Sequence, residues 1–212
     1  MGELLRMLID IHQETPEARK IQEVVQLLKQ DGVVIIPTDS VYAYACRLGS
    51  TKALERMADI RRIPPKQAHF SMICGSLSQV SEYVAPMPQP IFKLMKRALP
   101  GPFTFILEAS IRVPKIFGKH KKEVGIRIPD HAIPLAIVEG LGAPLVVGSV
   151  HWEGPEVEMV TDPGLVHERL GHNVDMTVSG GLGNPEASTV IDCRSGHAEL
   201  IRQGRGQLES IH

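Results

Sequence analysis

The chain has 212 residues, of which 43% are hydrophobic and 22% charged, and its formal net charge is -1. These ordinary globular values exclude a disordered or collagen-like chain, and no apolar run approaches the roughly 20 residues of a membrane span. The acids inside the N-terminal apolar stretch are unlike a secretory signal. Cys46, Cys74 and Cys193 lie far apart without a CxxC pair, which argues against zinc and a disulfide framework. We therefore expect a cytoplasmic protein without a membrane partner, in which the three thiols are free and have no functional role.

The first third of the chain predicts two helices around a buried strand. Thr15-Pro16-Glu17 reads as an N-cap, a proline at the first helical position and an early acid, and the helix ends at Asp31-Gly32. The β-branched run Val33 to Ile36 is typical of a strand buried on both faces. A second helix begins at Thr51 and stops at Pro64-Pro65.

The remaining two thirds alternate strands with helices. Helices are expected around Leu94, near 132–139 and after the cap Thr161-Asp162-Pro163, and strands at 70–74, 103–108, 124–128, 145–149, 174–178, 188–192 and 199–202. This irregular alternation predicts an α/β (α+β) protein with a single domain over 1–212, in which helices flank a twisted sheet of mixed parallel and antiparallel strands. Loops at the strand ends would then form a crevice.

The charges are distributed unevenly along the chain. Residues 52–127 hold 14 basic and 5 acidic side chains, whereas residues 128–212 hold 4 basic and 12 acidic ones. A basic middle segment can focus positive potential on polyanions such as ATP or RNA. We expect it, including Lys93, Lys96, Lys119 and Lys121, to line a basic concave crevice; the alternative is a set of scattered solvated charges.

Five segments together resemble one protein family. They are Pro37-Thr-Asp-Ser-Val-Tyr42 after a buried strand, Pro100-Gly-Pro-Phe-Thr104, Gly125-Ile-Arg-Ile-Pro129, Ser188-Thr-Val-Ile-Asp192 and Ile201-Arg-Gln-Gly204. Each is weak alone, and Thr38, Asp39 and Ser40 are also ordinary turn formers. In this order the set is similar to the YrdC-like (threonylcarbamoyl-AMP synthase) family, over about residues 20–206. The resemblance implies a YrdC/RibB-like fold.

The resemblance also implies an activity. The family's synthase joins L-threonine, bicarbonate and ATP into threonylcarbamoyl-AMP, releases pyrophosphate and feeds the t6A modification of tRNA. Such a nucleotidyltransferase needs cations that stabilise phosphate charge, with Mg²⁺ held mainly by the triphosphate rather than by a protein metal site. Familiar nucleotide signatures such as GxxxxGK[ST] and GxGxxG are absent from the sequence.

Site residues follow from the resemblance as expectations. Those expected to bind the amino acid are Thr38, Ser40, His69, Arg127 and Ser188; those expected to bind the nucleotide are Arg61, Arg62, Ser149, His151 and Arg202; and those expected to be catalytic are Arg61, Lys66 and Arg127. We expect Thr38, Arg61, Arg127, Ser149, Ser188 and Arg202 to converge on one crevice.

Three departures from the synthase pattern resemble the YciO-type branch. In the KxRP motif, Arg61 replaces the first lysine and Ile63 the arginine, while Ala68 replaces a later lysine. In the SxN motif, His151 replaces the asparagine, which makes it either an acid–base group or a hydrogen-bonding ring. Ala43 replaces the glycine of YGL.

These changes leave other functions open. One alternative is a non-catalytic protein that binds double-stranded or structured RNA, including tRNA, through the basic surface. Its binding would weaken steeply with salt, and the sparse aromatic residues, 4% of the chain, argue against stacking of single strands. A second alternative is a carbamoyl or adenylyl enzyme that takes another amino acid.

Overall fold

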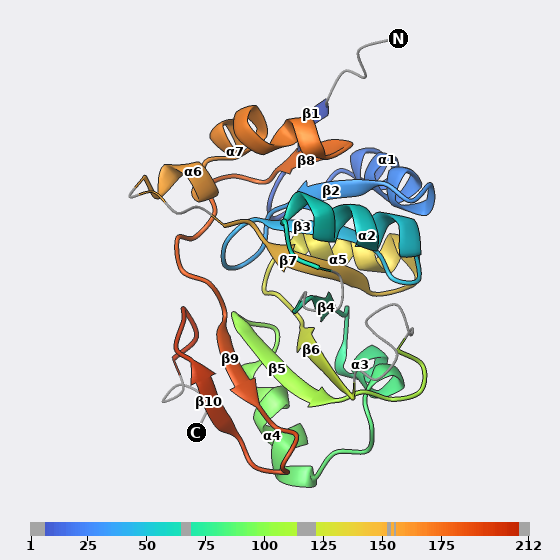
Figure 1. Ribbon diagram of the computed structural model, residues 1–212, viewed down its shortest axis with the longest axis vertical. Coiled ribbons are helices and arrows are strands. Elements are labelled where there is room, and N and C mark those ends of the chain that lie inside the picture. Colours follow the sequence, from blue (N-terminus) through green and yellow to red (C-terminus); the bar gives the residue numbers. More distant parts are fainter. Residues whose placement is uncertain (1–6, 65–68, 114–121, 152–153, 155, 208–212) are drawn as a thin grey trace.

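The computed structural model describes residues 7–64, 69–113, 122–151, 154 and 156–207. Within these residues ten strands form one sheet in the order β1-β8-β2-β3-β7-β4-β6-β5-β9-β10 (Figure 1). The strands are β1 (Met7–Asp10), β2 (Val33–Ile36), β3 (Ala43–Arg47), β4 (Ser71–Ile73), β5 (Phe103–Glu108), β6 (Glu123–Arg127), β7 (Leu145–Ser149), β8 (Met176–Ser179), β9 (Thr189–Asp192) and β10 (Glu199–Arg202).

Parallel and antiparallel pairs are combined in this sheet. The parallel pairs are β1–β8, β2–β8, β4–β6 and β5–β9, and the remaining neighbours are antiparallel. The mixed α/β sheet predicted from the sequence is therefore confirmed. Strands β2, β5 and β7 have the predicted bounds, because each is an apolar run buried on at least one face.

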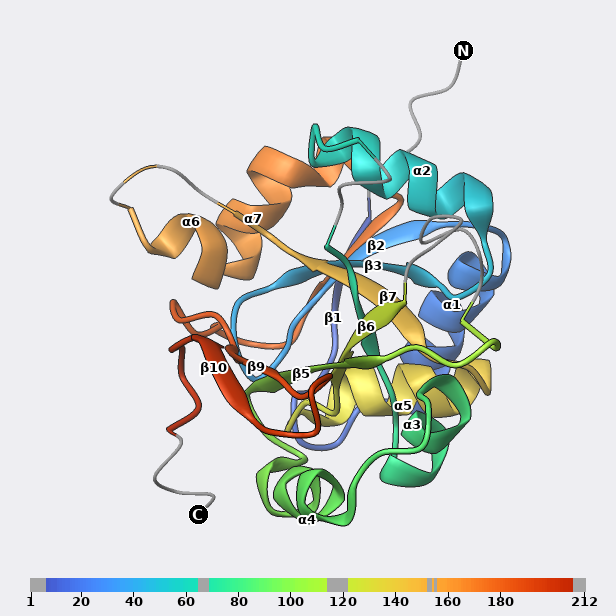
Figure 2. The ribbon, with the colours of Figure 1, turned by 60° about the horizontal axis from the view of Figure 1, so that its bottom comes forward.

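Helices cover both faces of the sheet. They are α1 (Ala18–Lys29), α2 (Thr51–Ile60), α3 (Leu77–Tyr83), α4 (Gln89–Ala98), α5 (Ala132–Leu141), α6 (Glu158–Thr161) and α7 (Pro163–Leu170). Figure 2 shows α1 and α5 on one side of β2, β3 and β7, with α2, α6 and α7 on the other. Each face accordingly has its own apolar core.

The half of the sheet that carries β5, β6 and β9 is covered on one face only. Val124 and Ile126 of β6 belong to the same core cluster as Ile91 and Leu94 of α4. Because side chains alternate along a strand, Glu123, Gly125 and Arg127 of β6 point the other way. This second face forms the floor of a cavity.

Some elements differ from the prediction. Helix α1 begins at Ala18 rather than after Thr15, and the Thr15 hydroxyl hydrogen-bonds the His12 ring at 2.9 Å instead of capping the helix. Strands β1 and β3 and helices α3 and α6 had no counterpart in the predicted elements. In β3 the residues Ala43 to Cys46 are all buried, so the alternation that marks a half-exposed strand is missing.

Candidate functional site

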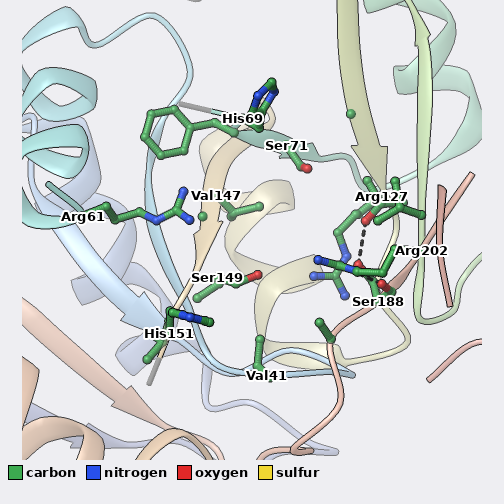
Figure 3. A pocket seen from close by; sticks show the side chains of 18 of the residues that line it. Val41, Arg61, His69, Ser71, Arg127, Val147, Ser149, His151, Ser188 and Arg202 are labelled. Atoms are coloured by element: carbon green, nitrogen blue, oxygen red, sulfur yellow. Dashed lines mark hydrogen bonds between the residues drawn. The ribbon is translucent and has the colours of Figure 1, made fainter. Parts of the chain in front are cut away.

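A cavity of about 600 Å³ opens on the uncovered face of the sheet (Figure 3). Its floor comes from alternate residues of neighbouring strands, namely Ala43, Ser71, Thr104, Ile106, Glu123, Gly125, Arg127, Val147, Ser149 and Val190. Three arginines, Arg61, Arg127 and Arg202, line it, and Glu123 is the one lining carboxylate among the described residues. A hollow of this size, partly apolar with a few charged groups, suits a small molecule that carries negative charge.

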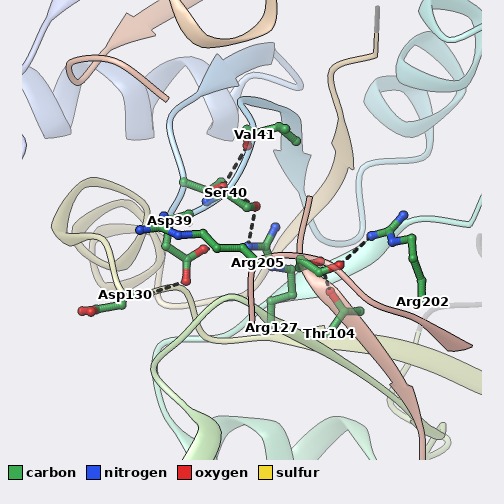
Figure 4. A network of polar contacts seen from close by, with 10 residues as sticks. Asp39, Ser40, Val41, Thr104, Arg127, Asp130, Arg202 and Arg205 are labelled. Carbon is green, nitrogen blue, oxygen red and sulfur yellow. Dashed lines mark hydrogen bonds and ion pairs between the residues drawn. The ribbon is translucent and has the colours of Figure 1, made fainter. Parts of the chain in front are cut away.

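Arg127 is held by a buried network at one end of the cavity (Figure 4). Its Nη2 donates to Asp39 Oδ1 at 2.7 Å and to Ser40 Oγ at 2.9 Å, and only 5% of each ion-paired side chain is exposed. The other Asp39 oxygen accepts from the Asp130 backbone N–H at 2.9 Å. Burial lowers the pKa of the Arg127 guanidinium, and the Asp39 carboxylate opposes that shift.

Part of the Arg127 guanidinium lacks a partner in the described part of the chain. Its Nε is buried and makes no hydrogen bond within the described residues. A buried donor without a partner costs free energy. The unpartnered Nε is therefore consistent with a ligand acceptor that completes the fork, as guanidinium–carboxylate pairs are frequently bidentate.

Thr38 and Ser40 lie behind Arg127 rather than on the cavity surface. The Thr38 hydroxyl donates to the Val41 carbonyl at 2.8 Å and accepts from the Ser40 N–H at 3.1 Å, and Ser40 is fully buried. Thr38 and Asp39 line a second, smaller hollow of about 310 Å³. The expected convergence of six residues is thus wrong for Thr38, which serves the loop conformation; the other five line the cavity.

Ser188 and Arg202 complete the Arg127 end. The Ser188 and Thr104 hydroxyls hydrogen-bond each other at 2.8 Å, and Arg202 Nη2 donates to the Ser188 carbonyl at 2.8 Å. The parallel pairing of β5 with β9 places Thr104 beside Val190, next to Ser188. Segments that are 84 residues apart in the sequence therefore supply one polar wall.

Arg61 lies at the opposite end of the cavity. It is the C-cap residue of α2, and its guanidinium stands over the Phe70 ring, with Cζ 5.6 Å from the ring centroid, a cation–π geometry. A Cβ on Gly148 would lie 2.8 Å from Arg61 Nη1, so the glycine makes room for this side chain. Burial lowers the Arg61 pKa.

Arg61 differs from Arg127 in its charge environment. No carboxylate of the described residues forms an ion pair with Arg61. His69, Ser149 and His151 line the cavity near it (Figure 3). This end therefore presents a half-buried positive charge without a carboxylate counter-ion among the described residues.

The remaining basic residues are placed differently. Arg62 is exposed and does not belong to the lining of the cavity, because α2 ends there and the Arg62 backbone turns to φ 52°. Lys66 lies outside the described residues. The broad expectation for segment 52–127 is wrong for Lys93 and Lys96, which are exposed on α4 at the helix-covered face; Lys119 and Lys121 lie outside the described residues.

Several site residues were not predicted from the sequence. Asp39 was interpreted only as a turn former, and Ser71, Gly148 and Phe70 received no role, although all contribute to the cavity or its arginines. Their partners are distant in sequence, so the local pattern carries no signal for them. Gly125 lay in a recognised segment, but its steric role depends on its neighbour Ser71.

The fold and cavity define an α/β protein with an arginine-lined cavity on one face of its sheet. The chain belongs to the Sua5/YciO/YrdC family, whose model, described as "Telomere recombination", matches residues 26–204. It is 34% identical to YciO of Escherichia coli strain K12 over 200 residues, covering 94% of this chain and 96% of that protein. The crystal structure of E. coli YciO superposes with a TM-score of 0.87 and covers 100% of both chains.

Synthases are also similar to the chain. It is 28% identical over 179 residues to the threonylcarbamoyl-AMP synthase of Halorhodospira halophila, covering 84% of this chain and 92% of that protein. P. abyssi Sua5 complexed with L-threonine shares the fold, with a TM-score of 0.81 at 24% identity, and is matched over 57% of its own length. Among the helices of the described residues, none has the length and apolarity needed to cross a bilayer.

Proposed function

We propose that this chain binds ATP together with an amino acid and joins them, with bicarbonate, into an N-carbamoyl aminoacyl adenylate, releasing pyrophosphate. The observation that carries the proposal is one cavity with cationic groups at both ends, Arg61 at one and Arg127 with Arg202 at the other. The amino acid of choice is L-threonine, since relatives at 28% identity are named threonylcarbamoyl-AMP synthases. The product then feeds the t6A modification of tRNA.

Arg127 and the other two arginines of the cavity suit different groups of the substrates. Arg127 is fixed by Asp39 and Ser40, so its remaining donors form a rigid fork for a carboxylate. Ser188 lies beside it as a hydroxyl for the same ligand. The P. abyssi protein of the same fold binds L-threonine in its structure, which supports an amino-acid site in this type of cavity.

Arg61 and Arg202 suit the phosphates. Arg61 has no carboxylate partner among the described residues, and its burial strengthens attraction to a phosphate. Arg202 reaches the cavity from edge strand β10 and uses one guanidinium nitrogen on the Ser188 carbonyl. In the described part of the chain no group of three or more His, Cys, Asp or Glu side chains is arranged to hold a metal, so Mg²⁺ would be coordinated mainly by phosphate oxygens.

The direct test is calorimetry with ATP–Mg²⁺, followed by pyrophosphate release with bicarbonate and each amino acid in turn. Arg202→Ala and Arg61→Ala should each weaken ATP binding by about 1–3 kcal/mol, the usual cost of a lost charge-assisted hydrogen bond. Lys93→Ala, at an exposed position of α4, is the matched control and should leave binding unchanged. Pyrophosphate release should be slow, because the KxR and SxN segments are altered.

RNA titrations beside the ATP calorimetry distinguish the proposed enzyme from a protein that binds RNA. Duplex RNA titrated at two salt concentrations should then bind tightly with a steep salt dependence, and Arg202→Ala should weaken it no more than Lys93→Ala. Tight RNA binding without any ATP heat would refute the enzyme. The placement of Lys93 and Lys96 away from the cavity favours the small-molecule ligand.

A further inference from the structure

Ser71 occupies the middle of the cavity floor. Strand β4 lies between β7 and β6 in the sheet, and Ser71 pairs with Val147 on one side and with Gly125 on the other. Adjacent strands are about 4.8 Å apart, so Ser71 lies one strand from Val147, which precedes the Gly148 that makes room for Arg61. On its other side it lies one strand from Gly125, two residues before Arg127. Figure 3 shows it between these two arginines.

Gly125 keeps the Ser71 hydroxyl open to the cavity. A Cβ built on Gly125 would lie 2.8 Å from Ser71 Oγ and 3.4 Å from the Thr104 methyl group. Any larger residue at 125 would therefore crowd the hydroxyl. Because Gly125 has no side chain, the floor of the cavity stays open beside the Ser71 hydroxyl.

The Ser71 hydroxyl has no hydrogen-bond partner within the described residues, in contrast to its neighbours. Ser188 and Thr104 bond each other, and Ser40 bonds Arg127. A hydroxyl can donate one hydrogen bond and accept others, and Ser71 can orient toward a ligand without breaking any internal contact. Its removal should therefore cost the free protein little.

We propose that Ser71 is a ligand-binding residue, whose hydroxyl donates to an oxygen of the bound substrates where the carbamate of the amino acid meets the phosphates. This rests on the proposed function. Arg127 holds the carboxylate and Arg61 attracts the phosphates, so the groups that must approach each other lie between these two arginines, over β4. Both groups are oxyanions, and a positioned donor stabilises such charge.

The test compares Ser71→Ala with Ser81→Ala. The control removes an exposed hydroxyl on α3 that bonds the Leu77 carbonyl. Each variant is measured by its melting temperature without ligand, by dissociation constants for ATP–Mg²⁺ and L-threonine, and by kcat and KM of pyrophosphate release. Ser71→Ala should melt like the wild type but lose about tenfold in kcat/KM, as expected for one hydrogen bond to a charged group.

Gly125→Ala supplies a second, steric test. The added methyl group crowds Ser71 Oγ, so this variant should melt lower and also lose substrate. In Ser71→Ala/Gly125→Ala the clash with the hydroxyl is gone, so the melting temperature should recover, while the loss of kcat/KM should persist. If Gly125 only avoids a steric clash and Ser71 contacts no ligand, the double variant should regain activity together with stability. That result would overturn the assignment of Ser71 as a ligand-binding residue.

The outcomes separate this inference from the proposed function. Ser71→Ala with wild-type affinities and turnover overturns the role of Ser71 alone. If wild-type protein binds the substrates without releasing pyrophosphate, the proposed reaction is refuted. The dissociation constants of Ser71→Ala then show whether the Ser71 hydroxyl contacts the bound ligands, since weaker binding supports the contact and unchanged binding overturns it. Wild-type protein that responds to neither ATP–Mg²⁺ nor an amino acid overturns both.

Discussion

Replacing Asp39 with alanine should strongly destabilise the protein. The Asp39 carboxylate accepts from Arg127 Nη2 at 2.7 Å and from the Asp130 N–H at 2.9 Å, and both ion-paired side chains are 5% exposed. The variant leaves a buried guanidinium without its counter-ion, which typically costs about 3–5 kcal/mol. In a chain of this size each kcal/mol lowers Tm by roughly 2–4 °C, so Tm should fall by roughly 6–20 °C.

Equilibrium urea unfolding measures this cost directly. The midpoint should fall while the slope with urea stays constant, because the same surface is exposed on unfolding. Glu82→Ala is the control: its pair with Arg112 is 50% and 66% exposed, and such surface pairs contribute about 0–1 kcal/mol. Asp39→Ala/Arg127→Met removes both charges and should recover much of the loss. An Asp39→Ala cost as small as that of Glu82→Ala would refute the reasoning.

Three further outcomes follow from the described residues. His131 Nδ1 accepts from the Ile133 N–H and burial lowers the His131 pKa; the folded state therefore disfavours the proton, and stability is retained above the ordinary histidine pKa of about 6.5 and falls as pH drops below it. His131→Asn keeps an N-cap acceptor and should reduce this dependence in urea unfolding between about pH 7 and 5; an unchanged dependence would contradict it. Gly148→Ala should displace Arg61 and weaken ATP binding on the order of tenfold in calorimetry. Wild-type ATP affinity in this variant would contradict a role for Arg61 in phosphate binding. Burial raises the pKa of the cysteine thiols, to about 12 for Cys46 and Cys74 and about 11 for Cys193, so a thiol reagent should label the protein only after denaturation, and rapid native labelling would count against these burials.

How far sequence predicted the structure depended on the range of the interactions. Val33 to Ile36 is four consecutive apolar residues, and it forms the buried strand β2 with those bounds. Asp162 was predicted to cap a helix and does so, because a cap bond reaches only two or three residues. Local chemistry was sufficient in both cases.

Contacts across the sheet could not be derived in this way. Asp39 and Arg127 are 88 residues apart, and their pairing requires β2 and β6 to deliver their ends to one place. Nothing in Pro37-Thr38-Asp39 distinguishes an acid that holds an arginine from one that forms a turn. Similarly, the exposure of Ser71 depends on the register that places Gly125 beside it.

The environments of Arg61 and Arg127 assign them different roles in the proposed reaction. The charge of Arg127 is opposed by Asp39 at 2.7 Å, so its contribution to a ligand is chiefly directional: a fork fixed in space with Nε still unpartnered. Arg61 is held by an aromatic ring and by the space over a glycine, neither of which carries a counter-charge. Of these two residues, Arg61 therefore supplies net attraction for a polyanion, and Arg127 supplies geometric selection. Consequently, Arg61→Lys should keep much of the phosphate affinity, since a lysine retains the charge. Arg127→Lys should lose amino-acid selectivity, since an ammonium cannot reproduce the fork. Calorimetry with ATP–Mg²⁺ and with a panel of amino acids measures both effects. A large loss of ATP affinity in Arg61→Lys, or unchanged amino-acid selectivity in Arg127→Lys, would contradict this division of roles.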